Sequence, residues 1–149
     1  MLKAKDIMTV DVYSVQEDTE LKTFAALLEK TGVSTMPVVD GDNVLIGVVS
    51  ATDLIDRDKP LHIPTVVSLF DWVIYLESEK NFEEQVQRIS AQTVGEICTK
   101  PAISCTPETP VSEIADMMVT KKIHLIPVVD EEHLVGVVAR LDIVKSLGA

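Results

Sequence analysis

Basic residues are scarce in this sequence of 149 residues. Thirteen lysines and arginines stand against 24 aspartates and glutamates, so the formal net charge at pH 7 is −11. Nucleic acids and anionic membrane surfaces need a basic face on their partner, and the composition therefore argues against both. A small anionic ligand is compatible with the same charge, because it needs only one locally favourable pocket.

Cysteines and long apolar runs are also few. Cys98 and Cys105 match neither a CxxC motif nor a zinc ligand set, which predicts free thiols in a reducing compartment. The first residues lack the apolar centre of a signal peptide. The longest apolar stretch, Val66–Leu76, is interrupted by Ser68 and Asp71 and is far shorter than the ~20 residues that span a bilayer. These absences predict a soluble cytoplasmic protein that does not bind membranes.

Catalytic motifs are missing from the sequence. His62, His124 and His133 have no nucleophile elbow beside them, and there is no Walker loop, GxGxxG or HExxH. The histidines and cysteines are too dispersed along the chain to form a metal site. The sequence therefore predicts a protein that is not an enzyme, binds no metal and needs no obligatory cofactor.

The most prominent feature that the sequence does contain is an internal repeat. Residues 6–40 align with residues 96–130, and after a turn that is one residue shorter in the second copy, residues 45–53 align with residues 134–142. The identities between the copies are Ile7, Thr9, Ser14, Thr19, Ala25, Pro37-Val38-Val39-Asp40, Leu45, Gly47-Val48-Val49 and Asp53. Ordered identities of this kind indicate a duplicated structural unit.

The apolar pattern of each copy predicts the same order of secondary-structure elements, β-α-β-β-α. In the first copy, Leu21, Phe24, Ala25 and Leu28 recur at the spacing of an amphipathic helix, and apolar strands follow. One copy of about fifty residues is marginally stable alone, so we expect the two to pack around a pseudo-twofold axis in a mixed α/β fold. The predicted division is residues 1–57 for the first repeat, 58–92 for a connection with a helix, and 93–149 for the second repeat.

The connection between the repeats carries an aromatic cluster. Phe70, Trp72 and Tyr75 are three of the chain's six aromatic residues. An exposed cluster of this kind is typical of a surface that covers a cleft or contacts another subunit. Packing on the core of the two repeats explains it equally well, and the sequence does not separate these alternatives.

The repeats resemble the CBS domain, the regulatory module named after cystathionine β-synthase. The resemblance rests on the start Asp6-Ile7-Met8-Thr9, on the strand end Pro37–Asp40, and on the run Gly47–Leu54. Two such units in register are similar to a CBS pair, or Bateman module. The resemblance implies clefts between the units that bind AMP, ADP, ATP or S-adenosylmethionine. It also implies a homodimer and a regulated partner protein whose identity leaves no signature in the chain.

Asp53 is the main candidate for ligand binding. It stands where a strand gives way to a helix, and a fixed carboxylate there can accept hydrogen bonds from both hydroxyls of a ribose. Ser50 matches the hydroxyl residue of the family motif. The alternative is that Asp53 and Thr52 only cap the helix. By resemblance, the first ligand site consists of Thr9, Tyr13, Val33, Ser34, Thr35, Met36, Ser50, Thr52, Asp53 and His124.

His124 is the candidate for phosphate binding. Nucleotide-sensing members of the family that the chain resembles carry a histidine or arginine shortly before the proline of the partner unit, and His124 occupies that position. A lone histidine at the edge of a strand is the alternative. Because the chain as a whole repels anions, we expect AMP to bind better than ATP.

The second copy departs from the family pattern. Ala139 replaces the hydroxyl of Ser50, whereas Asp142 keeps the carboxylate and Arg140 adds a cation that faces either a phosphate or solvent. We therefore expect the site with Asp53 to bind more tightly than the site with Asp142. By resemblance, this weaker second site consists of Thr99, Ile103, Ile123, Leu125, Ile126, Arg140 and Asp142.

Two functions are compatible with these residues. The first is a regulatory module that binds an adenosine-containing ligand, with AMP favoured, and signals to a partner by a conformational change. The second is a structural or interaction module with empty clefts, which acts through its dimer surfaces. Ser50 and Asp53 favour the first function, and Ala139 and the shortage of cations favour the second.

Overall fold

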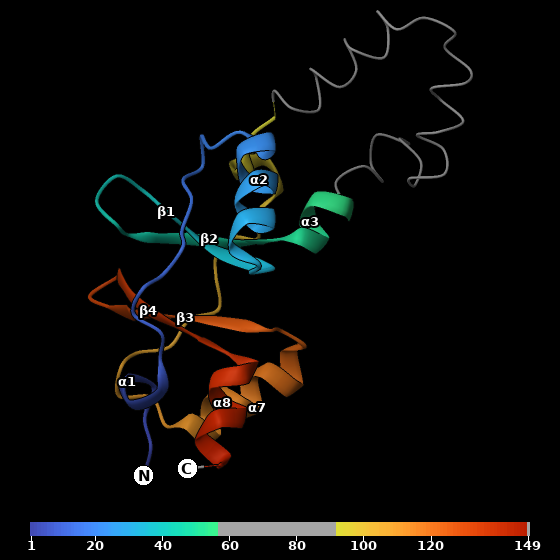
Figure 1. The fold of residues 1–149 in the computed structure, drawn as a ribbon. Coiled ribbons are helices and arrows are strands. Elements are labelled where there is room, and N and C mark those ends of the chain that lie inside the picture. Colours follow the sequence, from blue (N-terminus) through green and yellow to red (C-terminus); the bar gives the residue numbers. More distant parts are fainter. Residues whose placement is uncertain (57–91, 149) are drawn as a thin grey trace, which may run out of the picture.

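The computed structural model describes residues 1–56 and 92–148, which form two bodies of helices and strands, one above the other in Figure 1. The first repeat contributes α1 (Ala4–Ile7), α2 (Leu21–Thr31), β1 (Thr35–Val39), β2 (Leu45–Ser50) and α3 (Ala51–Asp56). The second contributes α6 (Val94–Ile97), α7 (Val111–Lys121), β3 (Leu125–Asp130), β4 (His133–Ala139) and α8 (Arg140–Leu147). The predicted mixture of helices and strands in two repeats is confirmed.

Each body contains an antiparallel hairpin, and the two hairpins have matching registers. Thr35 of β1 lies opposite Ser50 of β2, and Leu125 of β3 lies opposite Ala139 of β4. Both pairings slip at the corresponding place, after Val38 and after Val128. The register places the first residue of one strand beside the last residue of the other, so the start of β1 and the Asp53 segment lie at the same end of their hairpin.

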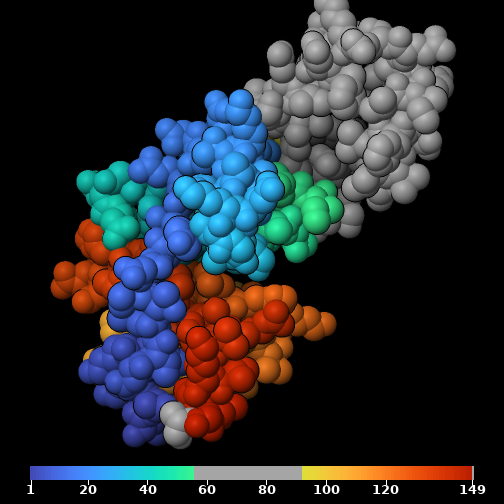
Figure 2. Space-filling model, in the orientation of Figure 1, coloured from blue at the N-terminus to red at the C-terminus, as the bar shows by residue number. Residues whose placement is uncertain are grey.

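The first strand predicted for each repeat is reduced to isolated bridges. Val15 makes a parallel bridge to Val38, and six residues earlier Thr9 makes an antiparallel bridge to Val137. The second repeat does the same through Cys105 and Thr99. The physical reason is that this segment runs from one hairpin to the other, as the blue chain in Figure 2 shows, and so it pairs with each only briefly.

This crossing exchanges helices between the bodies. Ala4 of α1 is fully buried with Ile114 and Ile126, whereas Val94 of α6 is fully buried with Phe24. Figure 1 shows α1, in dark blue, beside the orange and red elements, and the short yellow helix beside α2. Each hydrophobic core is therefore built from both sequence repeats.

Glycines make the crossing possible. A Cβ atom on Gly47 would lie 2.4 Å from the carbonyl oxygen of Thr99, and one on Gly136 would lie 2.8 Å from Sδ of Met8 and 3.0 Å from the carbonyl oxygen of Thr9. Close backbone approach of this kind leaves no room for a side chain. The repeated Gly-Val-Val motif thus serves the contact between a hairpin and the segment that crosses it.

Hydrogen bonds join the two hairpins at their turns. The backbone N–H of Leu45 donates to the carbonyl of Glu132 at 3.1 Å, and that of Leu134 donates to the carbonyl of Asn43 at 3.0 Å. The Asn43 side chain also donates to the carbonyl of Leu134 at 2.9 Å. The hairpins are closed at this end, and the spaces between them open at the other end, where β1 and β3 begin.

Exposed ion pairs hold the crossing segments at their outer ends. Lys3 and Lys5 both contact Glu108, at 2.7 Å and 2.9 Å. Their hydrogen bonds lower the pKa of the Glu108 carboxyl to about 2. In the other body Lys100 pairs with Glu17, and the hydrogen bond that Lys100 donates to that carboxylate raises the pKa of Lys100. The first and second repeats are thus joined at both ends of the molecule.

Some features predicted from the sequence lie outside the described residues. These are the inter-repeat helix and the aromatic cluster of Phe70, Trp72 and Tyr75. Within residues 1–56 and 92–148, no helix is long and apolar enough to cross a membrane. The same residues include no group of three histidine, cysteine, aspartate or glutamate side chains placed to hold a metal ion.

Candidate functional site

Two clefts lie between the hairpins. The Asp53 cleft has a volume of about 330 Å³ and is walled by the start of β1, the end of β2, the segment after α6 and the start of β3. The Asp142 cleft has a volume of about 770 Å³ and is walled by the pseudosymmetric elements. Both volumes are in the range of small-molecule sites. The structure therefore provides two related cavities for a ligand.

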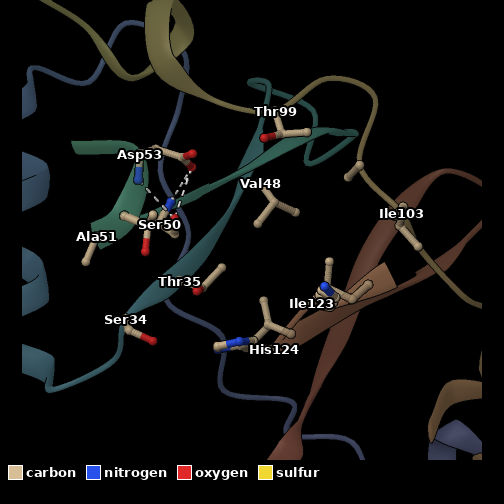
Figure 3. Close-up of a pocket in the computed structure, with 14 residues that line it drawn as sticks. Ser34, Thr35, Val48, Ser50, Ala51, Asp53, Thr99, Ile103, Ile123 and His124 are labelled. Carbon is tan, nitrogen blue, oxygen red and sulfur yellow. Dashed lines mark hydrogen bonds between the residues drawn. The ribbon is translucent and has the colours of Figure 1, made fainter. Parts of the chain in front are cut away.

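The Asp53 carboxylate is held from one side. Its Oδ2 atom accepts hydrogen bonds from the backbone N–H of Ser50 at 2.8 Å and from the Ser50 hydroxyl at 3.2 Å. The backbone N–H of Asp53 donates back to Ser50 Oγ at 3.2 Å, so the two residues cap α3 reciprocally, as Figure 3 shows. Among the described residues no group donates to Oδ1. One oxygen serves the helix cap, and the other is available to a ligand.

The Asp142 carboxylate has the same anchor and a different neighbour. Its Oδ2 atom accepts from the backbone N–H of Ala139 at 2.8 Å, in the manner of Asp53 and Ser50. Ala139 has no hydroxyl to add a second bond. The Oδ1 atom instead lies 3.4 Å from the hydroxyl of Thr9, which donates to it weakly. The second carboxylate is thus less rigidly held and already has a hydroxyl partner.

The crossing corrects the grouping of the predicted residues. Thr9, Tyr13 and Val33 were expected beside Asp53, but they line the Asp142 cleft. Thr99, Ile103 and Ile123 were expected beside Asp142, but they line the Asp53 cleft. The reason is that the segment that opens each repeat pairs with the hairpin of the other repeat, Thr9 with Val137 and Thr99 with Val48.

The remaining predicted residues divide into those in a cleft and those in a core. The Asp53 cleft contains Ser34, Thr35, Ser50, Thr52, Asp53, His124 and Leu125, and the Asp142 cleft contains Arg140 and Asp142. Met36 and Ile126 line neither cleft, because strand alternation turns both side chains into the cores, where they are fully buried. Their assignment to a ligand wall is corrected.

Sequence reasoning missed several cleft residues. Val48, Ala51, Ala102 and Lys122 line the Asp53 cleft, and Asp11 lines the Asp142 cleft. Ala102 adjoins the predicted Ile103, and Lys122 adjoins the predicted Ile123, so their neighbours were the available signal. Asp11 carries no such signal, since its place depends on the crossing.

A profile of one known family matches both halves of this architecture. The CBS domain profile matches residues 4–59 and 94–149, which is more than half of the chain. The chain belongs to the CBS domain family. The two matched units pack together, and the molecule is a CBS pair.

Relatives of this CBS pair include short and longer proteins. An uncharacterized protein of Methanocaldococcus jannaschii is 28% identical over 151 residues, which cover 96% of this chain and 89% of that protein. A second uncharacterized protein of the same organism is 26% identical over 146 residues, which cover 97% of this chain and 44% of that protein. The chain thus spans nearly all of one relative and less than half of another.

Solved structures show the same fold. The CBSX2 structure in complex with AMP has a TM-score of 0.75 and 23% identity, and the match covers 99% of this chain and 96% of that one. The CBS domain pair of protein MJ0100, solved with 5′-methylthioadenosine and S-adenosyl-L-methionine, has a TM-score of 0.72 and 22% identity, with 99% and 97% coverage. At these identities the likeness establishes the fold of this CBS pair and does not identify its ligand.

Proposed function

We propose that this CBS pair is a regulatory module that binds an adenosine-containing ligand, with AMP favoured, and signals to a partner protein. The observation that carries the proposal is the Asp53 carboxylate, which is fixed through Oδ2 and offers Oδ1 to the cleft. A preorganised acceptor of this kind suits the two adjacent hydroxyls of a ribose. Asp53 therefore has both roles considered from the sequence, since the helix cap orients the carboxylate for the ligand.

The rest of the Asp53 cleft suits the base and the phosphate. Val48, Ile103 and Ile123 provide apolar walls for adenine. His124 lies across the cleft from Asp53 in Figure 3, which separates a phosphate site from the ribose site. These features support an adenosine monophosphate, whose single phosphate adds little charge to an acidic protein.

Structural neighbours support the same ligand class. The CBSX2 structure contains AMP, and the MJ0100 structure contains two other adenosine derivatives. All three molecules share the adenosine group, and they differ in what is attached to its 5′ carbon. The ribose of this shared group carries the adjacent hydroxyls that the Asp53 carboxylate suits.

The proposed module is a cytoplasmic homodimer. Both thiols are free, as suits a reducing compartment, and burial raises the pKa of the Cys105 thiol to about 11.

The proposed dimer rests on an exposed apolar face of α8. This face consists of Leu141, Val144 and Leu147, with exposed fractions of 59%, 59% and 81%. Burial of this face against a second copy would remove it from water. A ligand that fits one arrangement of the two bodies better than another would then bias the dimer that the partner meets.

The test is a thermal-shift panel of adenosine, AMP, ADP, ATP and S-adenosylmethionine on the full chain. At one hundred times its dissociation constant, a ligand that binds only the folded state adds about 2.7 kcal/mol to the free energy of unfolding. We expect AMP to stabilise most. Asp53→Asn, which keeps an acceptor for the helix cap, should abolish most of the shift. Asp18→Asn, an exposed carboxylate outside both clefts, should not change it.

A second candidate function is that of an interaction module without a ligand. Ala139 in the Asp142 cleft and the exposed face of α8 favour it, since the first removes a ligand contact and the second offers a surface. The same panel decides between the two. A melting temperature that none of the five compounds raises would support the interaction module and contradict ligand binding.

A further inference from the structure

Among the described residues that line the two clefts, every lysine, arginine and histidine comes from the second repeat. Lys122 lines the Asp53 cleft, Arg140 lines the Asp142 cleft, and His124 lines both. All three also line one hollow between the end of α7 and the start of α8. They form a single cluster, which is unusual in a chain with a net charge of −11.

The first repeat has no such cluster at the equivalent positions. The internal alignment pairs Lys122 with Gly32 and His124 with Ser34, and it pairs Arg140 with Ala51. The described part of the first repeat therefore contributes no lysine, arginine or histidine to the walls of either cleft.

Local backbone geometry indicates that the cluster is not a by-product of the fold. Gly32 and Lys122 both end a long helix in the left-handed conformation, with φ of 74° and 54°. Glycine is the residue that this conformation favours, and the first repeat has it. The second repeat carries a lysine there in spite of the strain, which points to a function for the charge.

His124 joins the two clefts. It lies just before β3, and its carbonyl accepts a hydrogen bond from the backbone N–H of Arg140 at 3.3 Å. Ser34, Thr35 and Leu125 also line both clefts, so the two cavities share a wall. A phosphate seated on His124 from one cleft would occupy the space in front of the phosphate position of the other.

We propose that Lys122, His124 and Arg140 form one shared anion-binding cluster, so that the two clefts compete and the chain binds one phosphorylated ligand at a time. The inference rests on the proposed function and adds the regulation of the same sites. Two phosphate groups on one imidazole would repel each other at short range, and the described residues that line the two clefts include no lysine or arginine beyond Lys122 and Arg140. Occupancy of one cleft thereby controls the other.

The experiment is isothermal titration calorimetry of AMP and adenosine on the full chain and on two matched variants, Asp53→Asn and Asp142→Asn. Competition predicts one AMP per chain for all three proteins. In Asp53→Asn the single AMP moves to the Asp142 cleft and binds more weakly. Two AMP per chain in the unmodified protein would overturn the proposal. Complete loss of AMP in Asp53→Asn would also overturn it, because the second cleft would then never compete.

A second variant tests the shared residue. His124→Ser reproduces the residue of the first repeat, and we expect it to weaken AMP about tenfold in the unmodified background and in Asp53→Asn alike, while adenosine binding is unchanged. Lys121→Ala is the control, since it removes a neighbouring cation that lines neither cleft. Weakening in only one background would contradict a shared cluster. If neither adenosine nor AMP bound the unmodified protein, the proposed function itself would fail, which separates the two failures.

Discussion

The two clefts have nearly the same backbone and different side chains. Asp53 and Asp142 are anchored alike, through a backbone N–H three residues earlier. Ser50 reinforces the first anchor with its hydroxyl, whereas Ala139 leaves the second to a weak contact with Thr9. The comparison teaches that the two copies share the carboxylate and its backbone anchor and differ in the side chain that reinforces that anchor.

The same division holds within the repeats as a whole. Identical residues such as Gly47 and Gly136 lie where a hairpin meets the crossing segment, and a side chain there would collide with it. Residues that differ, such as Ser34 and His124, lie at the shared wall of the clefts. The repeats are therefore alike where a hairpin meets the crossing segment and unlike at the shared wall of the clefts.

The largest expected effect tests whether the two bodies unfold in one transition or independently of each other. Phe24 and its equivalent Ile114 are both fully buried, one in each core. We expect Phe24→Ala to lower the free energy of unfolding by about 3–5 kcal/mol and Ile114→Ala by about 2–5 kcal/mol. Because α1 and α6 are exchanged between the cores, each variant should shift one common transition in urea. Two separate transitions in either variant would show that the bodies unfold independently.

A smaller effect distinguishes the two crossing contacts. Gly47→Ala places a Cβ against the Thr99 backbone, which cannot move aside, and should lower the free energy of unfolding by about 1–3 kcal/mol. Gly136→Ala should cost less, since the nearest atom is the flexible end of Met8. Gly41→Ala, with nothing within 4 Å, is the control and should stay within ~0.5 kcal/mol. Equal losses at Gly47 and Gly136 in urea denaturation would contradict this ranking.

Exchanging the residues that end α2 and α7, Gly32 and Lys122, should change the free energy of unfolding in opposite directions. Lys122→Gly relieves a left-handed lysine and should raise the free energy of unfolding by about 1 kcal/mol. Gly32→Lys introduces the same strain in the first repeat and should lower it by a similar amount. Thermal unfolding of both variants measures the difference. A loss of stability in Lys122→Gly would show that the lysine side chain supports the fold itself.

The smallest expected effect concerns the surface ion pairs and depends on pH. Hydrogen bonds from Lys3 and Lys5 lower the pKa of Glu108 from 4.5 to about 2, so this carboxylate stabilises the fold above pH 4.5, and the contribution is lost as the pH falls toward 2. Glu108→Gln should therefore destabilise the protein slightly at pH 7, with the difference shrinking between pH 4.5 and pH 2. Glu17→Gln, which removes a carboxylate with one lysine partner, should have a smaller effect at pH 7. A Glu108→Gln effect that is constant with pH would contradict the linkage.

Local sequence patterns predicted the helices and strands well where the residues that contact one another are close in the sequence. The spacing of Leu21, Phe24 and Leu28 indicated α2, and the Pro-Val-Val-Asp and Gly-Val-Val motifs indicated the hairpins. A capping role for Asp53 was also considered from the sequence, together with Thr52, and the structure shows that the partner of Asp53 in the cap is Ser50. Such features depend on neighbours that the sequence itself supplies.

The partners of isolated residues were not readable in the same way. Thr9 and Thr99 each make one bridge to a hairpin, and a single bridge leaves no periodic pattern from which its partner could be inferred. The grouping of the site residues was wrong for that reason. Met36 was misplaced because alternation in a short strand does not by itself tell which face is covered.

The sequence by itself determined the duplication, the order of elements within each repeat and the carboxylate at the end of each hairpin, because each of these follows from interactions within a few residues or from identity between the copies. Only the tertiary structure decided which halves form each cleft. That choice depends on the exchange of α1 and α6 between the cores and on a backbone contact that glycine alone permits at Gly47. It was also the tertiary structure that brought Lys122, His124 and Arg140 of one repeat together at the walls of the two clefts.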